Sequence, residues 1–212
     1  FKHTDAFMRQ AVERFGRRVQ VSIPDLGGML DILASLRTTE KLLVDLIDRP
    51  ETIDRLVREV FDAWWVYYEH FYAIIAGRSP GCIAWAPVWS PGRTYMFQSD
   101  FAYMIGPAMF KRFVLPELTA CCQRVDHAFY HLDGIGQLPH LDMLLGIESL
   151  KGIQWIPGAG QKPAALWPDV INRILAAGKK TQLYSDNPGD VLSIIEATGG
   201  GRNLIANVGG VT

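Results

Sequence analysis

Residues 128–156 read AFYHLDGIGQLPHLDMLLGIESLKGIQWI, and this stretch carries the strongest signal for a fold class. It begins with the apolar run Ala128–Leu132, continues through a polar turn and a helical pattern, and ends in a second apolar run, Gly152–Ile156. Two strands on either side of a helix are typical of a βα unit on a parallel sheet. The nearly continuous apolar character of the runs indicates strands that are covered on both faces.

The same alternation of short apolar runs and longer helical patterns continues in both directions along the chain. The other strand candidates are Val19–Pro24, Cys82–Trp89, Thr181–Tyr184 and Leu204–Val208. Between the first two of these, apolar residues recur at every third or fourth position from Ile53 to Ile75. That spacing predicts a long amphipathic helix.

No repeat, linker-like or low-complexity segment interrupts the pattern, so residues 1–212 are expected to form a single domain. The predicted fold class is α/β, a (β/α)₈ TIM-type barrel of which this chain contains the C-terminal six βα units. Six strands are too few to close a barrel that typically takes about 250 residues, so an N-terminal portion is expected to be missing. A doubly wound open sheet is the alternative, although no G-x-G-x-x-G follows any predicted strand.

The composition argues against several classes of partner. The net charge of −1 provides no basic surface for nucleic acid or an anionic membrane, and no apolar run is long enough to span a bilayer. The three cysteines, Cys82, Cys121 and Cys122, include no C-x-x-C pair. This odd count without a disulfide framework predicts buried thiols in a reducing, cytoplasmic setting.

Candidate site residues follow from the predicted strand ends, because parallel βα folds place their active sites at the C-terminal ends of the strands. The polar and aromatic residues at these ends are Asp25, Trp89, His131, Asp133, Gln154, Trp155, Tyr184, Asp186 and Asn207. Arg93, in a loop, could hold a substrate carboxylate or phosphate, although a solvated side chain is the simpler interpretation. Ser99-Asp100 is interpreted as the N-terminal cap of a short helix.

His131 and Asp133 form the sharpest of these signals. Alternation along a strand places them on the same face, about 6.5–7 Å apart along the backbone. Their side chains could converge on one metal ion or form a hydrogen-bonded acid/base pair. The alternative is an inward-facing histidine whose carboxylate neighbour satisfies it without any chemistry.

Three segments resemble the uroporphyrinogen decarboxylase superfamily. They are HLDGIGQLPHLDMLLGIESLKGIQWIPGAG (131–160), SDFAYMIGPAMFKRFVLPEL (99–118) and the stretch from Pro24 to Glu59. The resemblance covers nearly the whole chain and implies a (β/α)₈ barrel. The superfamily includes cofactor-free porphyrinogen decarboxylases and zinc-dependent corrinoid and coenzyme M methyltransferases.

The resemblance leaves the chemistry open because the chain departs from both patterns. In the methyltransferases a His-x-Cys pair at a strand end and a distant cysteine bind zinc. His131 matches the first position, but Asp133 stands where the cysteine would be, and no cysteine follows Cys122. The arginine-rich segment of the decarboxylases lies near their N-terminus, outside this chain, and Asn207-Val208 occupies the region where they carry a histidine.

Three functions are therefore weighed. The first is a metal-assisted methyltransferase in which His131 and Asp133 bind Zn²⁺, with a small-molecule substrate and a corrinoid supplied by a partner protein as the expected methyl donor. The second is a decarboxylase without a cofactor, acting on a tetrapyrrole or small carboxylate, and the third is a barrel that binds ligands without turnover. A homodimer is compatible with all three.

The roles assigned to individual residues follow from these hypotheses. The expected catalytic residues are Asp25, Asp133 and Tyr184, and the expected metal ligands are His131 and Asp133. The expected substrate-binding residues are Arg93, Trp89, Gln154, Trp155, Asp186 and Asn207.

Overall fold

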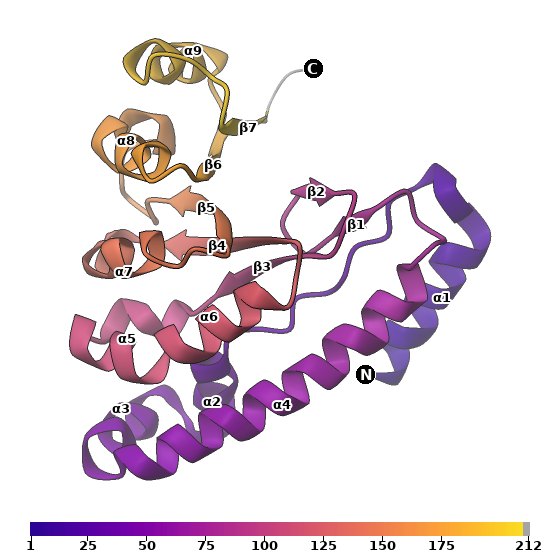
Figure 1. The fold of residues 1–212 in the computed structure, drawn as a ribbon, viewed down its shortest axis with the longest axis vertical. Helices are drawn as coiled ribbons and strands as arrows, with labels where there is room; N and C mark the ends of the chain where they lie inside the picture. The colour runs from indigo at the N-terminus through magenta and orange to yellow at the C-terminus, as the bar shows by residue number, and fades with distance from the viewer. Residues whose placement is uncertain (210–212) are drawn as a thin grey trace.

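The computed structural model describes residues 1–209 and contains a five-stranded parallel sheet in the order β3-β4-β5-β6-β7 (Figure 1). Its strands are β3 (Thr94–Gln98), β4 (His127–Asp133), β5 (Leu150–Ile156), β6 (Lys180–Ser185) and β7 (Leu204–Val208). Two short strands, β1 (Cys82–Ile83) and β2 (Trp89–Ser90), form a separate antiparallel hairpin. Residues 210–212, which the single-domain prediction includes, lie outside the described residues.

Helices connect the strands and precede the sheet. The α-helices are α1 (Lys2–Phe15), α2 (Met29–Arg37), α3 (Thr39–Asp48), α4 (Pro50–Ile75), α5 (Pro107–Phe113), α6 (Leu115–Gln123), α7 (Leu141–Leu145), α8 (Pro168–Ala176) and α9 (Pro188–Ala197). The 3-10 helices are η1 (Gly16–Arg18), η2 (Asp100–Met104), η3 (Ile135–His140) and η4 (Ala164–Leu166).

The α/β class is confirmed, with neighbouring strands that follow one another in sequence. Helices α5 to α9 all lie on one side of the stacked strands (Figure 1). A doubly wound sheet reverses its strand order and places helices on both faces, whereas a βα barrel keeps sequential order and one helical layer. The arrangement is thus that of a partial βα barrel, and residues 1–209 do not close it.

Four of the predicted strands are confirmed as β4 to β7, but the two candidates nearest the N-terminus are wrong. Val19–Pro24 is extended and contributes one backbone hydrogen bond, from the Ile23 N–H to the Ile83 carbonyl, without joining a sheet. Cys82–Trp89 is not one strand, because the chain turns at Ala84–Val88 and pairs β1 with β2. Pro87 lies in this turn and has no N–H to donate to a strand ladder.

The strand β3 was not expected from the sequence. Its residues Thr94–Gln98 pair in parallel with His127–His131 of β4, and four of the five are buried. Polar residues at both its ends and the Ser-Pro-Gly turn before it make the segment resemble a loop in the sequence. β3 is the strand that fixes the position of η2 beside the end of β4.

The long helix predicted from Ile53 to Ile75 is confirmed as α4, which begins with proline in its first turn. The apolar stripe of this helix is buried, and it includes Trp64, Trp65 and Tyr68. Tyr68 donates a hydrogen bond to the Thr94 carbonyl at the beginning of β3. The buried aromatic residues of this stripe therefore pack as core.

The three cysteines are free and buried. Burial raises the pKa of Cys121 and raises that of Cys122 to about 12, so both thiols are protonated at neutral pH. In the part of the chain that the structure describes, no helix combines the length and the apolar character needed to cross a bilayer.

Candidate metal centre

One face of the parallel sheet carries a row of polar side chains near its C-terminal edge. In the strand register Gln98 of β3 pairs with His131 of β4, His131 with Gln154 of β5, and Gln154 with Gln182 of β6. Residues that are paired in a parallel ladder project from the same face of the sheet. The opposite face of these strands carries buried apolar residues such as Leu132 and Leu183 that pack towards the helices.

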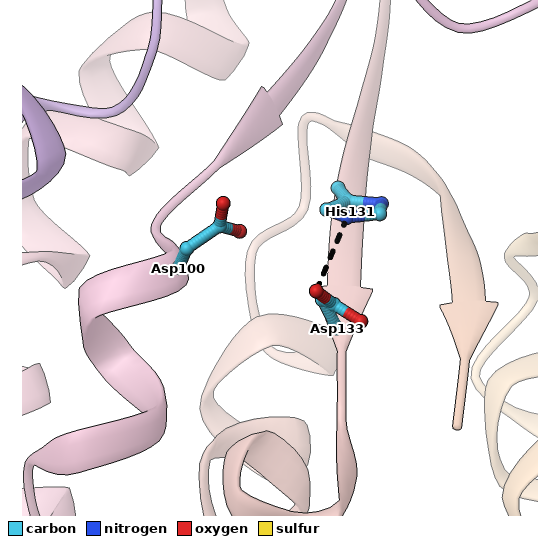
Figure 2. A group of neighbouring side chains, drawn as sticks. All are labelled: Asp100, His131 and Asp133. Atoms are coloured by element: carbon cyan, nitrogen blue, oxygen red, sulfur yellow. Dashed lines mark ion pairs between the residues drawn. The ribbon is translucent and has the colours of Figure 1, made fainter. Parts of the chain in front are cut away.

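Three potential metal ligands converge at the end of β4. One donor atom from each of Asp100, His131 and Asp133 lies within 4.8 Å of the other two (Figure 2). His131 and Asp133 come from the same face of β4, as the alternation in the sequence predicts, and the His131 Nε2–Asp133 Oδ2 distance is 3.9 Å. Gly134, at φ 82°, then turns the chain out of the strand.

Asp100 comes from the first turn of η2, which follows β3, and its carboxylate points towards β4 in Figure 2. The side chain is exposed, whereas His131 and Asp133 are partly buried. The neighbouring protein atoms still remove part of the hydration of the Asp100 carboxylate, which is the main cause that raises its pKa, and repulsion from Asp31, Asp133 and Asp25 raises it further. A cation at this point would relieve the repulsion between these carboxylates.

Asp31 holds the segment that carries Asp100. Its carboxylate accepts hydrogen bonds from the backbone N–H groups of Asp100 at 3.1 Å and Phe101 at 2.8 Å, and from the Gly28 N–H at 3.2 Å. Burial raises the pKa of Asp31, and the three backbone hydrogen bonds oppose this rise. Ser99 occupies the predicted N-cap position of η2, but its side chain makes no cap bond, and Asp31 supplies the acceptor instead.

We expect Asp31→Ala to lower the free energy of unfolding by about 1–3 kcal/mol, because it removes the acceptor for the N–H groups at the beginning of η2. Asp31→Asn should cost less than Asp31→Ala, since its amide oxygen can still accept from the Asp100 and Gly28 N–H groups that share Oδ2, although its NH₂ group then faces the Phe101 N–H. Urea unfolding of the two variants checks this. Equal losses in both variants would show that the acceptor is not what stabilises this turn.

Asp25 lies in the loop before α2, on the same side as the cluster. It is exposed, accepts a hydrogen bond from the Gly27 N–H at 2.8 Å, and contributes to the charge repulsion on Asp31 and Asp100. Only glycine fits at position 28 of the same loop, because a Cβ there would lie 2.2 Å from the Gln98 carbonyl oxygen. This glycine lets the loop approach the end of β3 closely.

The His131 ring is held on two sides. Trp85 meets it edge to face, with ring centroids 5.1 Å apart, and Nδ1 contacts the Gln154 side-chain oxygen. The Trp85 indole in turn donates to the Met96 carbonyl at 2.9 Å. Only 14% of the His131 side chain is exposed, so its ring has little freedom to turn.

Tyr184, Asp186 and Asn207 extend the same edge of the sheet away from the cluster. Tyr184 shares the face of Gln182 on β6 and is 43% exposed, and Asn207 accepts a hydrogen bond from Gln182 at 2.6 Å. Asp186 follows β6 and lies beside Gly209. The structure therefore brings the predicted catalytic residue Tyr184 and the predicted substrate-binding residues Asp186 and Asn207 to the edge that carries His131.

The structure does not place Arg93 and Trp89 at this edge, so the prediction that they bind substrate there is wrong. Arg93 precedes β3, at the N-terminal end of the sheet and roughly 16 Å of extended strand from Gln98. Its guanidinium is paired with Glu69 and packs over the ring of Tyr72. Trp89 belongs to β2 in the hairpin, beside Gly81, and ends no strand of the parallel sheet.

The prediction that Trp155 binds substrate is also wrong. It is fully buried on the face of β5 opposite to Gln154, where its ring meets Trp167 edge to face at 5.5 Å. A side chain between the sheet and the helices cannot reach a substrate over the polar face. Successive residues of a strand point to opposite faces, so only one of Gln154 and Trp155 could belong to the site.

The sequence analysis did not identify Asp100 as a member of the cluster, and it did not identify Asp31, which holds Asp100 in place. Asp100 follows β3 directly, apart from Ser99, so a correct prediction of that strand would have identified it as a strand-end residue. Asp31 has no such signal, because it acts through hydrogen bonds to a segment about 70 residues away.

Comparisons with known proteins give a fold but no family. No protein-family model matches the chain, and no curated protein matches it in sequence. In structure the chain is similar to a methyltransferase from Methanosarcina mazei, with a TM-score of 0.63 and 13% sequence identity. The match covers 97% of this chain, which spans 58% of the length of that protein. At this identity the likeness concerns the fold, and membership of the uroporphyrinogen decarboxylase superfamily stays a prediction.

Proposed function

We propose that this chain carries the metal-binding part of a methyltransferase site, with Zn²⁺ bound by Asp100, His131 and Asp133. The observation that carries the proposal is the convergence of these three donors within 4.8 Å at the C-terminal edge of a parallel sheet. The fold shared with a methyltransferase supports the choice of reaction. A uroporphyrinogen decarboxylase-like ancestry accords with it.

The residues fit a catalytic zinc site in number and type. Such sites use three protein ligands and leave a fourth position for substrate, and one imidazole nitrogen with carboxylate oxygens is an accepted donor set. Two carboxylates would balance the charge of the ion. Asp133 is 40% exposed, which leaves the cluster open on the side where a substrate would approach.

Asp100 supplies the third ligand, for which the sequence offers no cysteine after Cys122. The zinc methyltransferases that the chain resembles would provide cysteines at two positions, and here oxygen donors from Asp133 and Asp100 take their place. Oxygen donors are harder than thiolates, so manganese or iron(II) must be tested beside zinc.

The proposed reaction moves a methyl group to a nucleophile of a small-molecule acceptor. The metal would lower the pKa of the acceptor thiol or hydroxyl. The nucleophile forms a bond to the methyl carbon, while the bond from that carbon to the donor breaks and its electron pair stays with the donor. The donor is a methylated small molecule or a methyl-corrinoid on a partner protein.

We assign supporting roles to residues along the same edge. Asp25 is the exposed carboxylate proposed to take the proton that the acceptor loses. Tyr184, Asp186 and Asn207 are proposed to contact the substrate, because they lie further along the polar edge. The decarboxylase alternative loses its carboxylate-binding residue, because Arg93 is at the other end of the sheet and paired with Glu69.

The test is metal content followed by turnover. Metal-free protein should take up about one equivalent of zinc, and His131→Ala and Asp133→Ala should each abolish this uptake. The loaded protein should then speed methyl transfer from free methylcobalamin to a thiol, followed by the absorbance of the corrinoid. Failure to bind zinc, manganese or iron(II) would contradict the metal site, and binding without transfer would leave a metal-binding barrel of another function.

A further inference from the structure

A ladder of four hydrogen-bonded side chains crosses the polar face of the sheet, one from each of β4 to β7. His131 Nδ1 contacts Gln154 Oε1, Gln154 Nε2 donates to Gln182 Oε1 at 2.6 Å, and Gln182 Nε2 donates to Asn207 Oδ1 at 2.6 Å. Below, these four residues are called the amide ladder. It begins at the candidate metal ligand and ends at the last strand of the sheet.

The interior of the ladder is shielded from water. Gln154 is 1% exposed and Gln182 is fully buried. A buried amide that loses its partner costs about 1–3 kcal/mol, so the hydrogen bonds between these side chains are strongly preferred. Each amide has one acceptor oxygen and one donor NH₂ group, so the links of the chain must all run in one direction.

The direction of the ladder determines which nitrogen of His131 carries its proton. An amide oxygen only accepts, so a contact between Gln154 Oε1 and Nδ1 requires the proton to be on Nδ1. Nε2 then carries a free lone pair. In keeping with this, Nε2 lies 3.9 Å from Asp133 Oδ2, which is too long for a hydrogen bond.

We propose that the amide ladder holds His131 in the Nδ1–H tautomer and thereby presents the lone pair of Nε2 to a cation between Asp100 and Asp133. Gln154, Gln182 and Asn207 are positioning residues, since none of them contacts the cation. The inference rests on the proposed function for its purpose, but the tautomer itself exists without metal. Partners of this kind fix the orientation and basicity of metal-binding histidines.

The hydrogen bonds of the amide ladder could also all run in the opposite direction, and that arrangement predicts the other tautomer of His131. If every amide were reversed, Gln154 Nε2 would donate to Nδ1, and the His131 proton would be on Nε2. That N–H would draw the Asp133 carboxylate to hydrogen-bond distance, near 2.9 Å. A cation would then have to displace this proton before binding.

The test is long-range proton–nitrogen NMR of metal-free protein with isotope-labelled histidine, at a pH about two units above the usual histidine pKa of ~6.5. Such spectra distinguish the two neutral tautomers, and the His131 signals are identified by their loss in His131→Gln. The wild type should show Nδ1–H alone. Gln154→Leu should show a mixture or the other tautomer, because the acceptor is gone.

Asn207→Asp is the decisive variant. A carboxylate can only accept, so it fixes the direction in which Gln182 donates to residue 207 and should leave His131 as Nδ1–H. It also lies at the edge of the sheet, where a substitution is less disruptive than in the buried pair. Gln137→Leu removes another fully buried glutamine, bonded to Tyr130, and should leave the tautomer unchanged.

The outcomes separate the ladder from the proposed function. Nε2–H in the wild type, or a switch to Nε2–H in Asn207→Asp, would overturn the ladder even if zinc binds. An unchanged tautomer in Gln154→Leu would also overturn it. Nδ1–H in the wild type and in Asn207→Asp, lost in Gln154→Leu, would establish it even if the wild type binds no metal. Where zinc does bind, Gln154→Leu should weaken binding by about 10–100-fold.

Discussion

Replacing Asp100 by asparagine should weaken zinc binding by about 100-fold or more while leaving the protein folded. Loss of a partner that only orients a ligand costs about 10–100-fold in metal affinity, so loss of a ligand itself should reach at least the upper end of that range. Asparagine keeps the shape of the side chain but offers a neutral oxygen. It also leaves one positive charge of the ion without a balancing carboxylate.

The stability of the metal-free protein should change little, by about 0.5 kcal/mol or less, because Asp100 is exposed. Partial loss of hydration raises the pKa of Asp100 most, and repulsion from Asp31, Asp133 and Asp25 adds to this rise. Removing that charge therefore relieves repulsion in the absence of metal. Reduced zinc affinity without reduced stability is the signature that distinguishes a ligand from a structural residue.

Competition with a chromophoric chelator measures the zinc affinity of each variant. Asp186→Asn is the matched control, because Asp186 is an exposed carboxylate at the same edge of the sheet but outside the cluster. It should bind zinc like the wild type. If Asp100→Asn also binds like the wild type, Asp100 is not a ligand, and the two donors that remain are too few for the proposed centre.

The sequence predicted two of the three residues of this cluster, for a reason that is local. His131 and Asp133 are two positions apart on one strand, and the period of a strand is enough to place them on one face. Asp100 is 31 positions before His131, and it approaches the pair only because β3 aligns Gln98 with His131. A helix cap explained Ser99-Asp100 locally, and no local rule shows that Asp31 supplies the cap from another helix.

The errors in the site have the same origin as the errors in the fold. Taking Cys82–Trp89 as a strand of the sheet placed Trp89 at a strand end and Arg93 just beyond it. The sheet instead gains β3 at Thr94–Gln98, which places Arg93 before a strand rather than after one. The prediction for Trp155 was wrong for a different reason. A strand with apolar residues on both faces does not show in its sequence which face points towards the site.

Trp64→Ala is expected to lower the free energy of unfolding by about 3–5 kcal/mol, the usual cost of removing a buried tryptophan from a core. Trp64 is 3% exposed. Its ring stacks on Tyr68 and meets Tyr95 edge to face at 4.8 Å, so it joins α4 to β3. The indole N–H also donates to the Gly27 carbonyl at 3.0 Å, in the loop that carries Asp25.

Two variants separate the packing of Trp64 from its hydrogen bond. Trp64→Phe keeps most of the aromatic contact but leaves the Gly27 carbonyl without its donor, which should cost about 1–3 kcal/mol. Val66→Ala, at an exposed position of the same helix, should cost within about 0.5 kcal/mol. Chemical denaturation gives all three values.

A loss below about 1.5 kcal/mol in Trp64→Ala would contradict the packing of α4 on β3, since a cavity of that size in a close-packed core cannot be so cheap. That result would also count against the proposed metal centre, because β3 sets the position of Asp100 and α4 packs on β3. With the expected loss, zinc affinity per folded molecule in Trp64→Phe should stay near the wild-type value. Trp64 touches none of the three ligands, so its effect on the centre passes through the stability of β3.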